Sequence, residues 1–113
     1  MVQSSDQLDS TFAALSDPTR RGILERLGTK DSSISELAAT FGMSLTGIKK
    51  HVRILERAEM VTTEKVGRVR TCRMEPAALS LAEQWFNQRR TDWEHRLDRL
   101  GAHLRAFPEK EPK

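Results

Sequence analysis

The sequence has little of what most enzymes and metal-binding proteins display. It contains one cysteine, Cys72, among 113 residues, which excludes an internal disulfide and an all-cysteine metal site. The chain has no glycine-rich phosphate loop and no motif that groups a nucleophile with a base. We therefore expect no enzyme, no catalytic residues, no cofactor and no metal ion.

Long apolar runs are also missing. No stretch is apolar enough to span a bilayer, and the opening MVQSSDQLDS lacks the basic start and the apolar stretch of a signal peptide. These absences predict that the membrane is not a partner and that the protein is cytoplasmic.

Positive charge is concentrated in one central segment, Ser44–Met74. This segment contains eight basic and three acidic residues, whereas the rest of the chain contains 11 basic and 13 acidic residues. The formal net charge of +3 therefore originates in the middle of the chain. Such a concentration indicates a polyanionic partner, with an ordinary solvated surface as the alternative.

Two capped helices with a glycine turn between them are predicted over about residues 33–59. Ser33 has capping-box spacing with Glu36, and Gly42 ends the helix that they begin. Ser44 caps a second helix. Apolar residues recur at helical spacing in this helix, namely Ile48, Val52 and Leu55. This order is typical of a helix-turn-helix.

Further helices are predicted before this motif. One covers Asp6–Leu15, and the next begins at Pro18 with Asp17 as its N-cap and ends at Gly28. A polar turn, Lys30-Asp31-Ser32, then leads into the helix-turn-helix.

A β-hairpin and a long helix are predicted after it. The stretch MVTTEKVGRVRTCRM alternates with a period of two and has Gly67 at its centre, which predicts a hairpin over about residues 61–74. Cys72 is expected to be a small strand residue rather than a thiol sensor. From Pro76 to Phe107 the pattern is helical, and residues 108–113 are expected to be a disordered tail.

The second helix of the motif has a basic face opposite its apolar stripe. Thr46, Lys49, Lys50, Arg53 and Arg57 lie within one arc about 100° wide. A helix of this kind fits the major groove of B-DNA, where lysine and arginine meet phosphates and base acceptors. The sequence thus predicts double-stranded DNA as the partner. The predicted DNA-binding residues are Ser44, Thr46, Gly47, Lys49, Lys50 and Arg53 on the helix, and Lys65, Arg68 and Arg70 on the hairpin.

Two residues of this helix have two interpretations each. Glycine at position 47 either lets the helix start approach DNA or the preceding helix, or relieves packing against the helix that ends at Phe41. His51 lies on the apolar side, and we interpret it as a structural histidine rather than as a phosphate contact.

This order of elements resembles the ArsR/SmtB-type winged-helix transcriptional regulators. The segments that carry the resemblance are LSDPTRRGILERL, ISELAATFGMSLTGIKKHVRILERAEMV and KVGRVRTCRM. The resemblance implies a mainly α-helical winged helix-turn-helix with a small β-hairpin, here one domain over residues 1–113. It also implies a sequence-specific homodimeric repressor of an inverted-repeat operator. The terminal helices would dimerise through Leu8, Phe12, Trp93, Leu97, Leu100 and Leu104.

The chain also departs from the family pattern. It has ELAAT where metal-sensing members carry a cysteine pair, and Asp92, His95, Asp98 and His103 do not match the zinc-site spacing of other members. We therefore predict a repressor that does not respond to metals. Glu59 stands where the family usually has glycine, which leaves the geometry of that helix end open.

Two alternatives stay open. One is a metal- or small-ligand-sensing repressor with a site between subunits, with Trp85, Phe86 and Trp93 either lining a pocket for an unidentified inducer or forming dimer core. The other is a winged-helix module for protein or RNA. Stacking on single-stranded RNA is disfavoured, because the segment Ser44–Met74 contains no Phe, Trp or Tyr.

Overall fold

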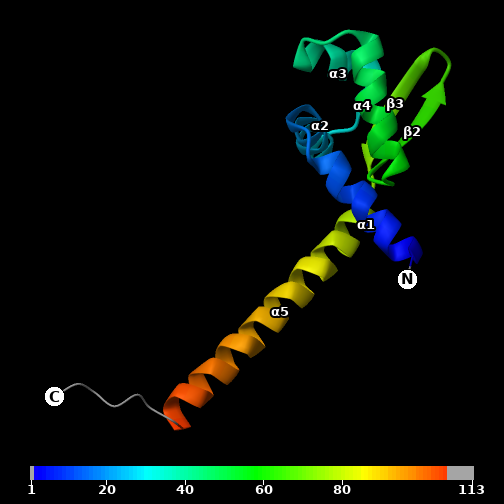
Figure 1. The fold of residues 1–113 in the computed structure, drawn as a ribbon. Helices are drawn as coiled ribbons and strands as arrows, with labels where there is room; N and C mark the ends of the chain where they lie inside the picture. The colour runs from blue at the N-terminus through cyan, green and yellow to red at the C-terminus, as the bar shows by residue number, and fades with distance from the viewer. Residues whose placement is uncertain (1, 107–113) are drawn as a thin grey trace. The chain divides into compact units, whose positions relative to one another are not determined.

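The computed structural model describes residues 2–106 of the chain, with side chains from Asp6 onward. Five α-helices and three short β-strands follow one another within these residues (Figure 1). Their bounds are α1 (Val2–Leu15), α2 (Pro18–Thr29), β1 (Ser32–Ser33), α3 (Ile34–Phe41), α4 (Leu45–Arg57), β2 (Val61–Val66), β3 (Val69–Met74) and α5 (Ala77–Ala106). The predicted fold class, mainly α-helical with a small β-hairpin, is confirmed.

The first two helices differ from the prediction at their ends. α1 begins at Val2 rather than at Asp6. α2 begins as predicted, because the Asp17 carboxylate accepts a hydrogen bond from the backbone N–H of Arg20 at 3.0 Å. The predicted stop at Gly28 is wrong, since α2 runs to Thr29. Gly28 is not among the glycines with positive φ, so it does not adopt the left-handed conformation that ends a helix, and the next turn closes with the Lys30 N–H donating to the Arg26 carbonyl at 3.1 Å.

The helix-turn-helix is set by local caps, as the sequence predicts. The Ser33 hydroxyl accepts from the Glu36 N–H at 3.0 Å, while the Ser33 N–H donates to the Glu36 carboxylate at 2.8 Å. Gly42 ends α3 at φ +61°, the left-handed conformation that favours glycine. Ser44 then caps α4 by accepting from the Gly47 N–H at 3.0 Å.

The end of α4 keeps the left-handed geometry that glycine normally supplies. Glu59 has φ +60°, its N–H donates to the Glu56 carbonyl, and the Met60 N–H donates to the Leu55 carbonyl. This pair of hydrogen bonds is a Schellman motif. The departure from glycine therefore leaves the helix end unchanged and adds backbone strain at Glu59.

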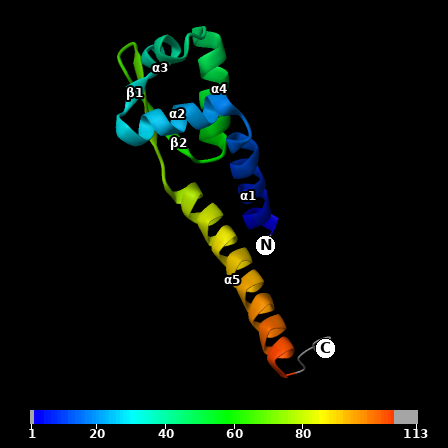
Figure 2. The same ribbon diagram turned by 90° about the vertical axis from the view of Figure 1, so that its left-hand side faces the viewer.

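A third strand joins the predicted hairpin. The antiparallel hairpin turns at Gly67, with φ +64°, and pairs Val61 with Met74 and Val66 with Val69. Figure 2 shows the hairpin as the long loop that leads down to α5, and its tip residue Arg68 lines a groove together with the start of α3. β1 pairs antiparallel with β3, so the order is β1-β3-β2. Ser32 was expected in a polar turn, and that expectation is wrong because the pairing partner of β1 lies about 40 residues away in sequence.

The buried core combines helices α1–α4 with the sheet and the start of α5. Fully buried large side chains come from α2, α3, α4 and the residues after it, namely Ile23, Leu37, Ile48, Leu55 and Met60. Cys72 is buried on β3, as expected of a small strand residue, and burial raises the pKa of its thiol to about 11. The thiol therefore stays protonated and unreactive near neutral pH.

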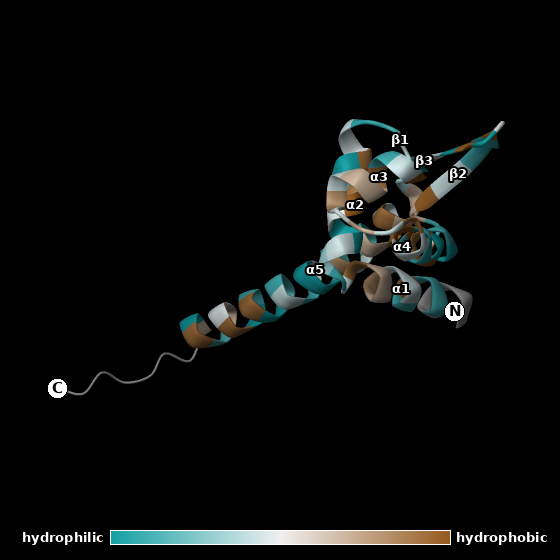
Figure 3. Cartoon of the chain, turned by 90° about the horizontal axis from the view of Figure 1, so that it is seen from above, coloured by the Kyte–Doolittle hydropathy of each residue, from teal (hydrophilic) through white to brown (hydrophobic). Residues whose placement is uncertain are grey.

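The chain divides into two compact units, Met1–Ala82 and Glu83–Lys113. The first contains α1 to α4 and the sheet. The second contains most of the residues of α5, along which apolar segments recur between polar ones (Figure 3). Trp85 and Phe86 meet there edge to face, with ring centroids 5.4 Å apart. The expected helix end at Phe107 and the expected tail lie outside the described residues.

Candidate nucleic-acid interface

α4 presents two faces of opposite chemistry, as its sequence predicts. Ile48, Val52 and Leu55 are at most 2% exposed and fix the helix to the core. The opposite side is exposed to solvent, and it carries Thr46, Lys49, Lys50 and Arg53. The helix is thus held by one face and leaves its basic face accessible.

The wing, which consists of β2, β3 and their turn, is tied to α4 by a chain of hydrogen bonds. Arg70 Nη1 donates to the Thr63 hydroxyl at 2.8 Å, and that hydroxyl donates to Glu56 Oε2 at 2.8 Å. Because Glu56 belongs to α4, this chain fixes the separation of the wing and the helix. The other two predicted wing residues, Lys65 and Arg68, are exposed.

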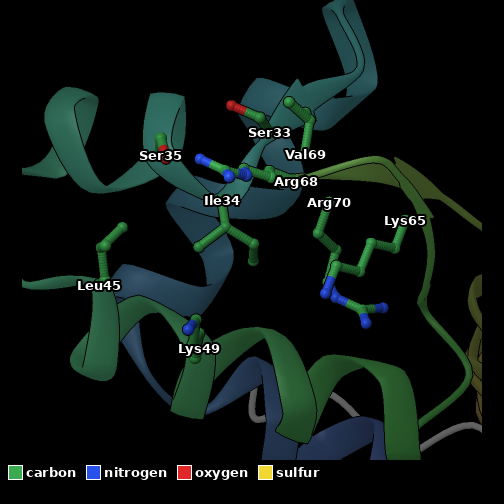
Figure 4. Close-up of a pocket in the computed structure, with 9 residues that line it drawn as sticks. All are labelled: Ser33, Ile34, Ser35, Leu45, Lys49, Lys65, Arg68, Val69 and Arg70. Atoms are coloured by element: carbon green, nitrogen blue, oxygen red, sulfur yellow. The ribbon is translucent and has the colours of Figure 1, made fainter.

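Cations from the helix and the wing converge on one groove. The groove has a volume of about 310 Å³ and lies between α4, the start of α3 and the wing (Figure 4). Its lining residues are Ser33, Ile34, Ser35, Leu45, Lys49, Lys65, Arg68, Val69 and Arg70. A second groove of about 400 Å³ shares part of this lining and adds Arg53 and Glu56. Four predicted DNA-binding cations therefore surround the first groove.

The positive charge of the grooves is not neutralised by ion pairs. The described residues contain two ion pairs, Asp31–Arg73 and Asp92–Arg89, and a third contact, Asp17–His51, which is an ion pair only when the imidazole is protonated. None of the three uses a groove cation. Glu56 is the acidic residue among the residues that line the two grooves. A polyanion entering here would meet mostly unpaired positive charge.

The remaining predicted DNA-binding residues lie outside both grooves. Ser44, Thr46, Gly47 and Lys50 belong to the start of α4 but do not line either groove. Sequence reasoning also missed seven lining residues, namely Ser33, Ile34, Ser35, Leu45, Val52, Glu56 and Val69. An apolar residue at the first position of a basic helix was the signal that could have identified Leu45.

Gly47 makes room for the turn that precedes α4. A Cβ atom built on Gly47 would lie 3.1 Å from Met43 Cε and 3.3 Å from Ser44 Oγ. Both atoms belong to the turn and the cap, rather than to Phe41. A side chain at position 47 would require the flexible end of Met43 to shift by a few tenths of an ångström, so local packing favours glycine without requiring it. A DNA contact by Gly47 stays a prediction.

His51 joins α4 to the start of α2. Its Nδ1 atom lies 3.3 Å from Arg20 Nη1 and 3.9 Å from Asp17 Oδ2, and its side chain is 19% exposed. Arg20 in turn donates to the carbonyls of Ala13 and Ala14 at the end of α1. A hydrogen bond from the backbone N–H of Arg20 lowers the pKa of Asp17 and keeps it ionised. These contacts favour the structural interpretation of His51.

Comparisons with known proteins agree with this architecture. A family model described as a helix-turn-helix domain matches residues 15–64. The crystal structure of an ArsR family transcriptional regulator is 41% identical in sequence with a TM-score of 0.76, and the match covers 80% of this chain and 93% of that one. This chain belongs to the ArsR family.

Further regulators match over most of their own length. An ArsR-like transcriptional regulator from Rhodococcus sp. RHA1 is 34% identical with a TM-score of 0.83, and the match covers 95% of this chain and 98% of that one. The transcriptional repressor SdpR of Bacillus subtilis (strain 168) is 37% identical over 60 residues, which are 53% of this chain and 67% of that protein. The predicted family and the winged helix-turn-helix are confirmed.

The part of the chain that the structure describes contains no cluster of potential metal ligands. No three His, Cys, Asp or Glu side chains gather there in a way that could hold a metal ion. His95 and His103 both lie on α5, where eight residues correspond to about 12 Å along the axis.

Among residues 2–106, no helix is long and apolar enough to cross a membrane.

Proposed function

We propose that this ArsR family chain is a homodimeric, sequence-specific repressor that binds an inverted-repeat DNA operator without a metal ion. The observation that carries the proposal is the convergence of Lys49, Lys65, Arg68 and Arg70 on one groove. They come from α4 and from the wing, and no ion pair of the described residues engages them.

Duplex DNA offers phosphates and base edges that these residues can contact together. α4 enters the major groove with its exposed face, which carries Thr46, Lys50 and Arg53. The sugar–phosphate strand that borders the major groove then runs between α4 and the wing, where the groove cations contact its phosphates. Backbone contacts of this kind supply affinity, and the helix face supplies sequence readout.

Dimerisation is supported by the apolar seam on α5. Trp93, Leu97, Leu100 and Leu104 are between 48% and 61% exposed in the single chain. Their 4-3-4 spacing is that of a helix–helix seam, and a second copy would cover it. On α1, Leu8 and Phe12 are half-buried and are the other residues through which we expect the chain to dimerise. A two-fold dimer presents two copies of α4, which is why the operator is an inverted repeat.

Selection of random duplex DNA by the purified protein, followed by sequencing, tests this proposal. We expect enrichment of an inverted repeat whose half-sites are about one helical turn apart. Binding to the selected operator should survive EDTA and added Zn²⁺. It should also survive an excess of RNA of the same sequence.

Each arm has an outcome that contradicts one part of the proposal. No enriched sequence would remove the specific DNA-binding function. An enriched site without two-fold symmetry would remove the proposed dimer on the operator. Release by Zn²⁺ would replace metal independence by metal sensing, with His95 and His103 as the first ligands to substitute. Loss of binding to RNA competitor would favour an RNA module.

A further inference from the structure

Leu45 is an exposed apolar side chain in a groove that four cations line. It is the first residue of α4 and is 48% exposed. It belongs neither to the buried core nor to the partly buried residues that pack against that core. Burial in the folded monomer therefore does not account for a leucine at this position.

The side chain of Leu45 shares its groove with Lys49, one turn further along α4. Figure 4 shows both side chains rising from α4 on the same side, with Ile34 and the wing residue Arg68 across the groove. Apolar and cationic groups thus point to the same space. A ligand that fits there carries negative charge and an apolar group close together.

We infer that Leu45 is a specificity-determining residue that contacts the C5 methyl group of a thymine in the operator. The inference rests on the proposed function. In a helix-turn-helix the first residues of the second helix contact the base edges. The thymine methyl is the apolar group that the major groove displays, and an aliphatic side chain recognises it by contact rather than by a hydrogen bond. Lys49 holds the adjacent phosphate and so fixes the register.

Deoxyuridine substitution tests the contact without changing the protein, because deoxyuridine differs from thymidine only by this methyl group. In the selected operator each thymine is replaced in turn, and affinity is measured by fluorescence anisotropy. We expect one pair of thymine positions, related by the two-fold symmetry of the operator, to be sensitive. At either position of this pair, the loss of the methyl should weaken binding about fourfold, which is the effect of burying one methyl group. The other positions should change little.

Two protein variants test whether Leu45 is the residue that contacts the thymine methyl group. Leu45→Ala should bind the thymine and deoxyuridine operators equally, which removes the fourfold difference. Ile54→Ala is the matched control, because Ile54 is also an exposed apolar residue of α4, at 37%, but lines neither groove. The control should keep the fourfold difference. Both residues are exposed, so both variants are expected to fold.

Three results would overturn the inference. Equal binding of wild type to all deoxyuridine operators would remove methyl recognition while the proposed function stands. A difference that persists in Leu45→Ala would assign the methyl to another residue, with Val69 next. Selection that enriches no operator would remove the proposed function and the inference with it.

5-Methylcytosine carries a methyl group at the same ring position as thymine. A second set of operators distinguishes recognition of thymine from recognition of 5-methylcytosine. Each cytosine of the operator is replaced by 5-methylcytosine. Thymine recognition predicts no gain in affinity from any of these replacements. A gain that Leu45→Ala abolishes, without a thymine effect, would overturn the assignment to thymine.

Discussion

The apolar stripes of α4 and α5 look alike in sequence and differ in the folded chain. On α4, Ile48, Val52 and Leu55 are at most 2% exposed, whereas on α5 Leu97 and Leu100 are about half exposed. Helical spacing of apolar residues shows which face a helix will bury, but not against what. The partner of α4 is the core of its own chain, and the proposed partner of α5 is a second copy.

The largest effect is expected from substitutions in the apolar seam of α5. Leu97→Glu with Leu100→Glu would place unpaired charges in the proposed dimer interface, which is strongly unfavourable. Monomers should form, and operator affinity should fall on the order of 100-fold or more, because two linked half-site contacts become independent. Sedimentation velocity measures the first effect and anisotropy the second.

The matched control introduces the same charge on the other side of α5. His95→Glu with Ala102→Glu lies roughly 180° from the stripe, at about 100° per residue. This variant should remain dimeric and lose little affinity. If both double variants stay dimeric, the stripe of α5 is not the interface, and its exposure has another cause.

A smaller effect is expected when one cation is removed from the exposed face of α4. Lys49→Ala should weaken operator binding several-fold and reduce the slope of log affinity against log salt by about 1.8, because the proposed dimer loses two phosphate contacts and each contributes about 0.9 to the slope. Titrations across salt concentrations measure both quantities. Lys30→Ala, an exposed lysine outside both grooves, should leave the slope unchanged. Equal slopes for both variants would contradict the assigned face.

The end of α4 offers a stability test of about 1 kcal/mol. Glu59 is held at φ +60°, so Glu59→Gly should relieve strain and raise the free energy of unfolding by about 1 kcal/mol. Glu59→Ala removes the same charge but keeps the strained backbone, so it should not stabilise. Thermal or urea unfolding separates the two. Equal stabilisation by both variants would mean that charge, not backbone conformation, limits stability here.

The smallest expected effect is electrostatic. Glu56→Gln keeps an oxygen that accepts from the Thr63 hydroxyl, while it removes the negative charge at the second groove. Operator affinity should rise about two- to threefold at low salt and return to the wild-type value at high salt, where screening weakens the repulsion. A loss of affinity instead would show that the ionised carboxylate is needed to position the wing.

Features set by neighbouring residues were predictable from the sequence. Ser33, Gly42 and Ser44 define the ends of α3 and α4 through side chains and backbone conformations within four residues. The hairpin turn at Gly67 follows from the same kind of local preference. Local signals therefore located the helix-turn-helix and the wing.

Features set by residues far apart in the chain were not predictable in the same way. Ser32 forms a strand only because β3 provides a partner, and two serines carry no strand signal of their own. The link from Glu56 through Thr63 to Arg70 likewise needs α4 and the wing to be placed first. The groove that Lys49 and Arg68 both line also depends on residues far apart in the chain. The sequence therefore predicted its cations but not its shape.

The short strand β1 has a mechanical consequence for the interface. Ser33 is paired with Thr71 of β3 and is also the cap of α3, so the start of α3 and the wing belong to one hydrogen-bonded frame. The start of α3 and the wing therefore cannot move apart independently, and the width of the groove between them is fixed. At the proposed DNA contact we therefore expect the DNA rather than the protein to change shape. The sequence-dependent stiffness of an operator would then contribute to affinity even at base pairs that no side chain touches.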